Sequence, residues 1–199
     1  MKVLVPIVLL VLLPGLAWSQ AEPGDAGFFA DAEGTLSAMP ADVGTVQSVY
    51  VVAFDLPTPL FAYEFGVDGL LESGAIVLSL TVPWPFPPIT DPDYDSVVVG
   101  TGSCVEATGA VMLARIDFFV PAPIPDDTAV CLTGSDPSSF PDGRPGWQDC
   151  EGEIHPFTPA TDGGEAYPDA CVILNATLPN PFHPVDATAS SFGALKARF

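Results

Sequence analysis

Apolar and polar side chains alternate with a period of two along much of this chain. In residues 46–54 the even-numbered side chains fall on one face and the odd-numbered ones on the other, and both faces are mostly apolar after Ser48. Successive side chains of a β-strand point to opposite faces, so a strand that is apolar on both is covered from both sides. This segment is therefore predicted to be a central strand.

Further segments show the same alternation. Residues 60–67 carry three aromatic side chains on one face and Glu64 on the other. Clusters of proline, glycine and aspartate separate the segments, as is typical of the turns between strands. The remaining predicted strands are residues 26–31, 75–82, 96–100, 111–120, 128–133, 147–151 and 170–174.

A helical pattern is confined to the C-terminal end. In residues 190–199 a serine at 190 or 191 can cap a helix, and Lys196 and Arg198 suit its negative end. Many short strands with turn signals and almost no helix favour an all-β fold. We predict an antiparallel β-sandwich, jelly-roll or immunoglobulin-like, of about nine strands with a short C-terminal helix.

The first residues have the three-part pattern of a secretory signal peptide. Lys2 precedes an apolar run at residues 3–13, and the small residues Ala17 and Ser19 suit a cut before Gln20 or two residues later. The run is shorter than the about 20 apolar residues that a membrane span needs. We expect a signal peptide at residues 1–19, a β-sandwich domain at 20–178, and a proline-rich connector with the helix at 179–199.

The composition is that of a folded and very acidic protein. Hydrophobic residues make up 48% of the chain and charged residues 15%, which separates it from disordered sequences. The formal net charge is −20, and all 25 carboxylates follow the predicted leader. Such a charge opposes binding to phosphate backbones, so no nucleic-acid partner is expected. No cysteine directly follows the leader and no second apolar span exists, so no membrane anchor is expected either.

The four cysteines predict disulfides. Cys104, Cys131, Cys150 and Cys171 all follow the leader, and an even count in an exported protein favours two bridges. Three pairings are possible. We favour Cys131–Cys150 with Cys104–Cys171, because the first bridge would close a loop rich in proline and glycine. The spacing of the cysteines matches no zinc module.

One turn carries three carboxylates at alternate positions, Asp91, Asp93 and Asp95. Calcium loops begin in this way, since Ca²⁺ takes about six to eight oxygen ligands. Ser96 and Gly102 stand where an EF-hand loop has glycine and glutamate, so this is not an EF-hand. The segment is either a plain surface turn or a calcium site of another kind, and no other cofactor is expected.

Two tryptophans and two histidines could carry other chemistry. Trp84 and Trp147 lie beside loops, where exposed rings can stack on sugars or can be clamped by prolines over the rim of the core. His155 and His183 both precede proline, which is typical of loop residues. A hydrolase would need one of them beside a serine or a carboxylate in a pocket. The chain has no G-x-S-x-G motif, and we assign no catalytic residue.

Two parts of the chain resemble known proteins. FFADAEGT at residues 28–35 and the ending SSFGALKARF at 190–199 resemble a group of secreted bacterial sandwich proteins with a tail of the Phe-Gly-Ala-Leu-Lys-Ala type. That resemblance implies a small exported sandwich and no activity. Residues 114–118 (ARIDF), which follow valine-rich strands, resemble a strand of cohesin-like modules, and this similarity implies the fold alone.

These expectations describe a secreted, acidic β-sandwich whose role is binding or structural rather than catalytic. A surface protein or a glycan is the expected partner. A carbohydrate-binding module and a secreted hydrolase are the alternatives. The first requires Trp84 or Trp147 to be exposed on a groove, and the second requires a histidine in a pocket.

Overall fold

The computed structural model describes residues 23–140, 143–162, 169–177 and 183–184. The predicted signal peptide and the predicted C-terminal helix lie outside these residues. The described part contains strands and turns, and among its residues there is no helix that is long and apolar enough to cross a membrane. The predicted all-β class is confirmed.

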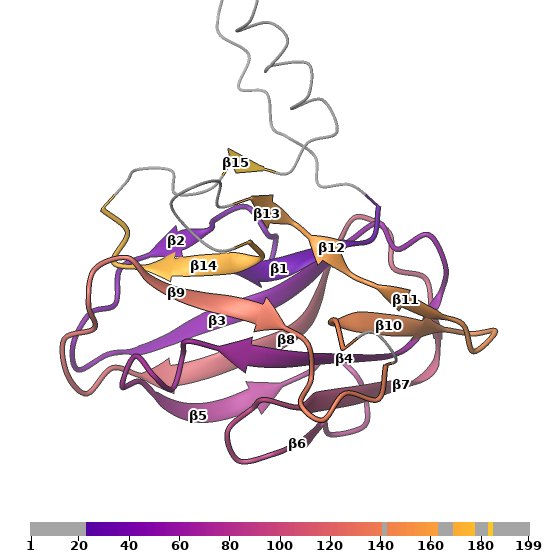
Figure 1. Ribbon diagram of the computed structural model, residues 1–199, viewed down its shortest axis with the longest axis horizontal. Coiled ribbons are helices and arrows are strands. Elements are labelled where there is room, and N and C mark those ends of the chain that lie inside the picture. The colour runs from indigo at the N-terminus through magenta and orange to yellow at the C-terminus, as the bar shows by residue number, and fades with distance from the viewer. Residues whose placement is uncertain (1–22, 141–142, 163–168, 178–182, 185–199) are drawn as a thin grey trace, which may run out of the picture.

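Two sheets pack face to face as a sandwich (Figure 1). Neighbouring strands are antiparallel except for the pairs β1–β12 and β2–β14. The first sheet has the order β12 (Thr158–Pro159), β1 (Asp25–Phe29), β3 (Val46–Phe54), β8 (Ala110–Phe119) and β5 (Ile76–Thr81).

The second sheet is larger. Its main path is β11 (Ile154–Pro156), β10 (Gly146–Asp149), β4 (Leu60–Asp68), β9 (Thr128–Thr133), β14 (Cys171–Leu174) and β2 (Ala38–Met39). β7 (Val97–Val105) pairs with β4, and β6 (Ile89–Thr90) pairs with β7. A separate two-stranded ladder joins β13 (Thr161–Asp162) and β15 (His183–Pro184).

All nine predicted strands are present, with ends shifted by a few residues. The six strands that were not predicted, β2, β6, β11, β12, β13 and β15, each have two or three residues. Such short strands leave no alternation to detect, because a period of two needs about four residues to be recognised.

The core lies between the two sheets. β3 and β8 supply buried aliphatic and aromatic side chains from the first sheet, and β4, β7 and β9 supply them from the second. β3 pairs with β1 on one side and β8 on the other, which confirms the central position that its two apolar faces predicted. The largest fully buried side chains include Tyr63, Phe28, Phe65 and Phe118.

The burial of β4 departs from its alternation at two residues. Phe61 is 44% exposed, although Tyr63 and Phe65 on the same predicted face are buried, and the pairing of β4 with β7 slips between Leu60 and Ala62. Glu64 is only 1% exposed, and its carboxylate accepts hydrogen bonds from the hydroxyl of Ser138 at 2.6 Å and from two backbone N–H groups of the same loop. These donors replace water around the buried carboxylate, as a buried charge requires.

The hydroxyl of Tyr63 links the two sheets. The ladder between β3 and β8 pairs Val51 with Ala114 and then Val52 with Met112, so Leu113 is the extra residue of a bulge. Its carbonyl accepts a hydrogen bond from Tyr63 at 2.5 Å, and the indole N–H of Trp84 donates to the same hydroxyl at 2.9 Å. Burial raises the pKa of Tyr63 above its usual range, which keeps the hydroxyl protonated as a donor.

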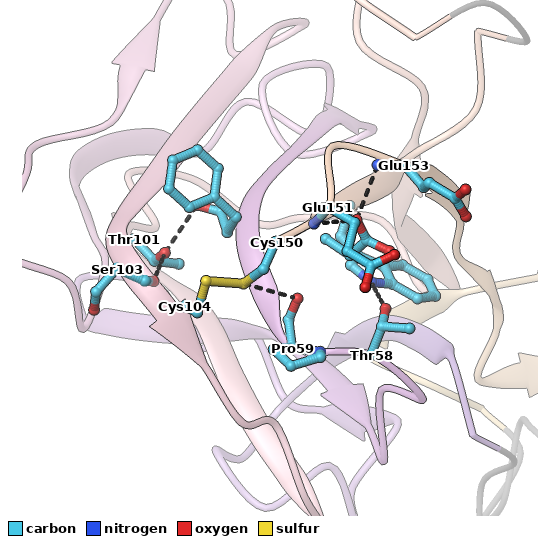
Figure 2. Close-up of a disulfide and its surroundings, with 11 residues drawn as sticks. Thr58, Pro59, Thr101, Ser103, Cys104, Cys150, Glu151 and Glu153 are labelled. Carbon is cyan, nitrogen blue, oxygen red and sulfur yellow. Dashed lines mark hydrogen bonds between the residues drawn. A yellow bond between two sulfur atoms is a disulfide. The ribbon is translucent and has the colours of Figure 1, made fainter.

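The two disulfides correct the pairing that we favoured from the sequence. Cys131 joins Cys171, and Cys104 joins Cys150 (Figure 2). Cys131 and Cys171 stand directly opposite each other on β9 and β14. The spacing along the chain did not reveal this, because bridge partners are chosen by strand register rather than by the composition of the loop between them.

We predict that Tyr63→Phe lowers the free energy of unfolding by about 1–3 kcal/mol, since it leaves a buried carbonyl and a buried indole N–H without a partner. Urea unfolding followed by fluorescence measures the change. Tyr50→Phe is the control, because Tyr50 makes no hydrogen bond with a described residue through its hydroxyl, and it should change stability by less than about 0.5 kcal/mol. Equal losses in the two variants would contradict this role of Tyr63.

Candidate binding face

The side of the first sheet that faces away from the core is the candidate binding site. Register across β3, β8 and β5 aligns its side chains in rows of three. We call these residues the outer face, and it consists of Val46, Phe119 and Ile76 in the first row, Ser48, Asp117 and Ser79 in the second, Tyr50, Arg115 and Thr81 in the third, together with Leu78.

The first row of the outer face is apolar, and its two flanking side chains are exposed. Val46 is 60% exposed, Ile76 is 51% exposed, and Phe119 lies between them on β8. Leu78, which is 54% exposed, extends this apolar strip along β5. A cluster of large apolar side chains in contact with solvent across adjacent strands is typical of interaction surfaces.

The second row is polar and internally connected. The carboxylate of Asp117 accepts hydrogen bonds from the hydroxyls of Ser48 at 2.6 Å and Ser79 at 3.0 Å, and from the guanidinium of Arg115 at 2.7 Å. These contacts, with the Ser48 hydroxyl first, hold the pKa of Asp117 below its usual value, against a smaller opposing effect of desolvation. One carboxylate therefore positions side chains from all three strands.

The outer face ends where the first sheet is covered again. Phe29 and Val52 are buried with Ala160 in a small cluster, and Tyr50 and Phe54 pack against it. Phe29 and Phe54 meet edge to face, with ring centroids 5.7 Å apart. Tyr50 thus forms the border between the covered end of the sheet and the open outer face.

A bulge interrupts the free edge of this sheet. β5 is the last strand on this side, and its ladder with β8 pairs Val77 with Phe118 and then Ser79 with Asp117, so Leu78 is unpaired. Bulges on edge strands hinder the addition of another strand. The geometry therefore favours contact through the outer face over extension of the sheet.

The predicted acidic loop lies between β6 and β7. Asp91 accepts the backbone N–H of Ser96 at 3.2 Å, and the backbone carbonyls of Tyr94 and Asp95 accept the N–H groups of Val67 at 3.0 Å and Asp136 at 2.9 Å. Partial desolvation and then the charges of Asp91, Asp93, Glu72 and Asp136 raise the pKa of Asp95. Among the described residues, the three carboxylates of this loop do not bring their oxygens within 4.8 Å of one another, and calcium binding here stays a prediction.

The structure buries one of the two tryptophans and half-buries the other. Trp147, which we considered as an exposed ring, is 3% exposed and lies between His155 and Phe157, with ring centroids at 5.0 and 5.1 Å. Trp84 is half-buried and is held against the core by its hydrogen bond to Tyr63. Both rings thus pack against other side chains, and stacking of Trp84 on a sugar stays a prediction.

A group that the sequence did not reveal lies on the β10–β11 hairpin. The Nε2 atom of His155 is 2.8 Å from Oδ2 of Asp149, and Glu153 brings a carboxylate oxygen to the same place, with all three ligand atoms within 4.8 Å of one another. The spacing Asp-x3-Glu-x-His across a tight turn is the sequence pattern from which this group could have been predicted. No described serine hydrogen-bonds to His155. The side chain of His183 lies outside the described residues.

Comparison with known proteins supports the fold. No family model and no curated relative matches the chain. The sandwich is similar to the cohesin module of a family 33 glycoside hydrolase from Clostridium perfringens, with a TM-score of 0.52 and 11% identity over 77% of this chain and 98% of that one. CaCohA2 from Clostridium acetobutylicum aligns with a TM-score of 0.44 and 12% identity over 83% of this chain and 99% of that one. The first similarity confirms the cohesin-like sandwich expected from residues 114–118.

We predict that Asp117→Asn destabilises the protein by about 1 kcal/mol near pH 7, because a charged acceptor of three hydrogen bonds becomes neutral. The folded pKa of Asp117 is depressed, so its contribution is complete above the unfolded value of about 3.9 and is lost as the pH falls through the folded pKa. Urea unfolding at neutral pH and near pH 2.5 measures this. If the difference in unfolding free energy between the variant and the unchanged protein were the same at both pH values, the lowered pKa of Asp117 would be contradicted.

The acidic loop predicts a stabilising effect of calcium. Because like charges surround Asp95, adding CaCl2 after chelator treatment should raise the midpoint of thermal unfolding, and the chelator should reverse the change. Asp95→Asn should reduce this increase. A calorimetric midpoint that is the same with calcium and with chelator would remove calcium from the description of this loop.

Proposed function

We propose that this chain is an exported, non-catalytic module that binds a partner protein through the outer face. The observation that carries the proposal is the apolar row of exposed Val46, half-buried Phe119 and exposed Ile76, which lies beside a fixed polar row centred on Asp117. Protein interfaces combine an apolar centre with polar surroundings in this way.

The rigidity of the outer face supports this role. Its side chains stand on three paired strands, and Asp117 already holds Ser48, Ser79 and Arg115 in place. A partner that docks here loses little free energy to the ordering of this surface, since pre-organisation reduces the entropic cost of association. The similarity to a cohesin module agrees with a sandwich that serves as a module, although at 11% identity it supports the fold alone.

The charge of the chain indicates the chemistry of the partner. With a formal net charge of −20, the module attracts basic surfaces over long range and repels acidic ones. We infer that the partner presents an apolar patch flanked by lysine or arginine residues. Association should then become slower as salt is added, because screening reduces electrostatic steering.

Three features support export and a non-catalytic role. The leader pattern at residues 1–19 and the two disulfides fit an oxidising compartment. One of the two histidines that a hydrolase could use, His155, pairs with Asp149 and stacks on Trp147. Buried Trp147 and half-buried Trp84 disfavour the carbohydrate-binding alternative.

The test uses the exported domain, immobilised with its disulfides intact, to capture proteins from the surface and the culture medium of its own source organism. A captured protein is then purified, and its affinity for each variant is measured. Ile76→Asp with Leu78→Asp should weaken binding roughly 100-fold, since hot-spot side chains each contribute more than about 1 kcal/mol.

Ile89→Asp is the matched control, because Ile89 is 74% exposed but lies on β6 in the other sheet. It adds a charge without touching the outer face and should bind like the unchanged domain. Loss of binding in the control alone would contradict the proposed site. Retention of the domain on a glycan array, lost with Trp84→Ala, would instead support the carbohydrate-binding alternative.

A further inference from the structure

Three ligand groups of different chemistry converge on the β10–β11 hairpin. Asp149 ends β10, Glu153 lies in the turn, and His155 is in β11. One atom of each, two carboxylate oxygens and one imidazole nitrogen, lies within 4.8 Å of the other two. The presence of imidazole separates this group from the acidic surface clusters that a chain with 25 carboxylates forms by chance.

The first of these ligands is fixed before any ion binds. Oδ1 of Asp149 accepts the backbone N–H groups of Glu151 and Glu153, both at 2.9 Å, and Oδ2 lies 2.8 Å from Nε2 of His155. Asp149 is only 5% exposed.

The second ligand is fixed by its ring. His155 stacks on Trp147 at 5.0 Å with an angle of 25° between the planes, while Glu153 is exposed and free to adjust its side chain. The turn itself is held by the backbone hydrogen bond from Asp149 to Glu153 at 2.9 Å and by the disulfide from Cys150 to Cys104 on β7. Two rigid ligands and one adaptable one can close around an ion at small cost.

The chemistry of the group selects the class of ion. Calcium and magnesium prefer sites made of oxygen, whereas an imidazole with carboxylates suits Zn²⁺ and related transition-metal ions. A tetrahedral Zn²⁺ with bonds of about 2.1 Å places two ligand atoms about 3.4 Å apart. The contact of 2.8 Å between His155 and Asp149 therefore needs to open by only about half an ångström.

We propose that Asp149, Glu153 and His155 bind one divalent transition-metal ion of the Zn²⁺ class, with water completing its coordination. The ion replaces the hydrogen bond between His155 Nε2 and Asp149 Oδ2 by two metal bonds, and the carboxylate of Glu153 closes the site from solvent. This site lies on the second sheet and is independent of the outer face, which belongs to the first.

The experiment is an isothermal titration of the disulfide-bonded chain, first stripped of metal, with ZnCl2 in the presence of excess CaCl2. One equivalent of Zn²⁺ should bind, and it should raise the midpoint of thermal unfolding. His155→Gln and Glu153→Gln should each weaken this binding about tenfold or more, because each removes one of three ligands. Glu106→Gln, which removes an exposed carboxylate on another loop, should bind Zn²⁺ like the unchanged chain.

Glu153→Gln separates loss of a metal ligand from loss of the fold, because Glu153 is exposed in the turn. Its thermal midpoint without metal should equal that of the unchanged chain. If the His155 and Glu153 variants bound Zn²⁺ as strongly as the unchanged chain does, the proposal would be overturned. Abolition of Zn²⁺ binding by excess CaCl2 would also overturn it, because the ion would then be held by carboxylates alone.

Discussion

The hydrogen bond from Tyr63 to the carbonyl of Leu113 is the contact on which the rest of the structure depends. It joins β4 of one sheet to a bulge in β8 of the other. The bulge puts both Leu113 and Ala114 in the core and thereby sets which later residues of β8 point outward. A slip of one residue would turn every side chain of a strand to the opposite face. Arg115, Asp117 and Phe119 consequently reach the outer face only in this register.

The disulfides add covalent links between parts of the second sheet. The bridged cysteines are 46 and 40 residues apart in the sequence. In the chain-entropy model each bridge lowers the entropy of the unfolded chain and thereby stabilises the fold by about 4 kcal/mol. Cys131–Cys171 fastens β14 to β9. Cys104–Cys150 fastens the β10–β11 hairpin to β7, which keeps Asp149 and His155 attached to the body of the protein (Figure 2).

Alternation predicted the strands of this protein well because both sheets bury one face. It located β3 and β8, since a strand of nine or ten residues repeats its pattern several times. Alternation could not show that Glu64 is buried. The donors that stabilise this carboxylate lie at residues 138–140, and only the fold brings them close.

The candidate sites were less predictable than the strands. Trp147 lies beside a loop in the sequence, but the short strand β11 folds His155 over it, and this pairing leaves no trace in a period of two. The cysteine partners and the group of Asp149, Glu153 and His155 depend on the same register between distant or very short strands. The outer face could not be predicted without the strand order, because Val46 and Ile76 lie on strands that pair with opposite sides of β8.

The central claim is that this sandwich meets its partner through an open, pre-formed sheet face. Covalent labelling of solvent-exposed side chains, compared between the free and the partner-bound domain by mass spectrometry, tests it most directly. We predict protection at residues 46–50, 76–81 and 115–119, with unchanged labelling of Ile89 and of the loop at 91–95. Protection confined to that loop or to the β10–β11 hairpin, with residues 76–81 still labelled, would contradict the account.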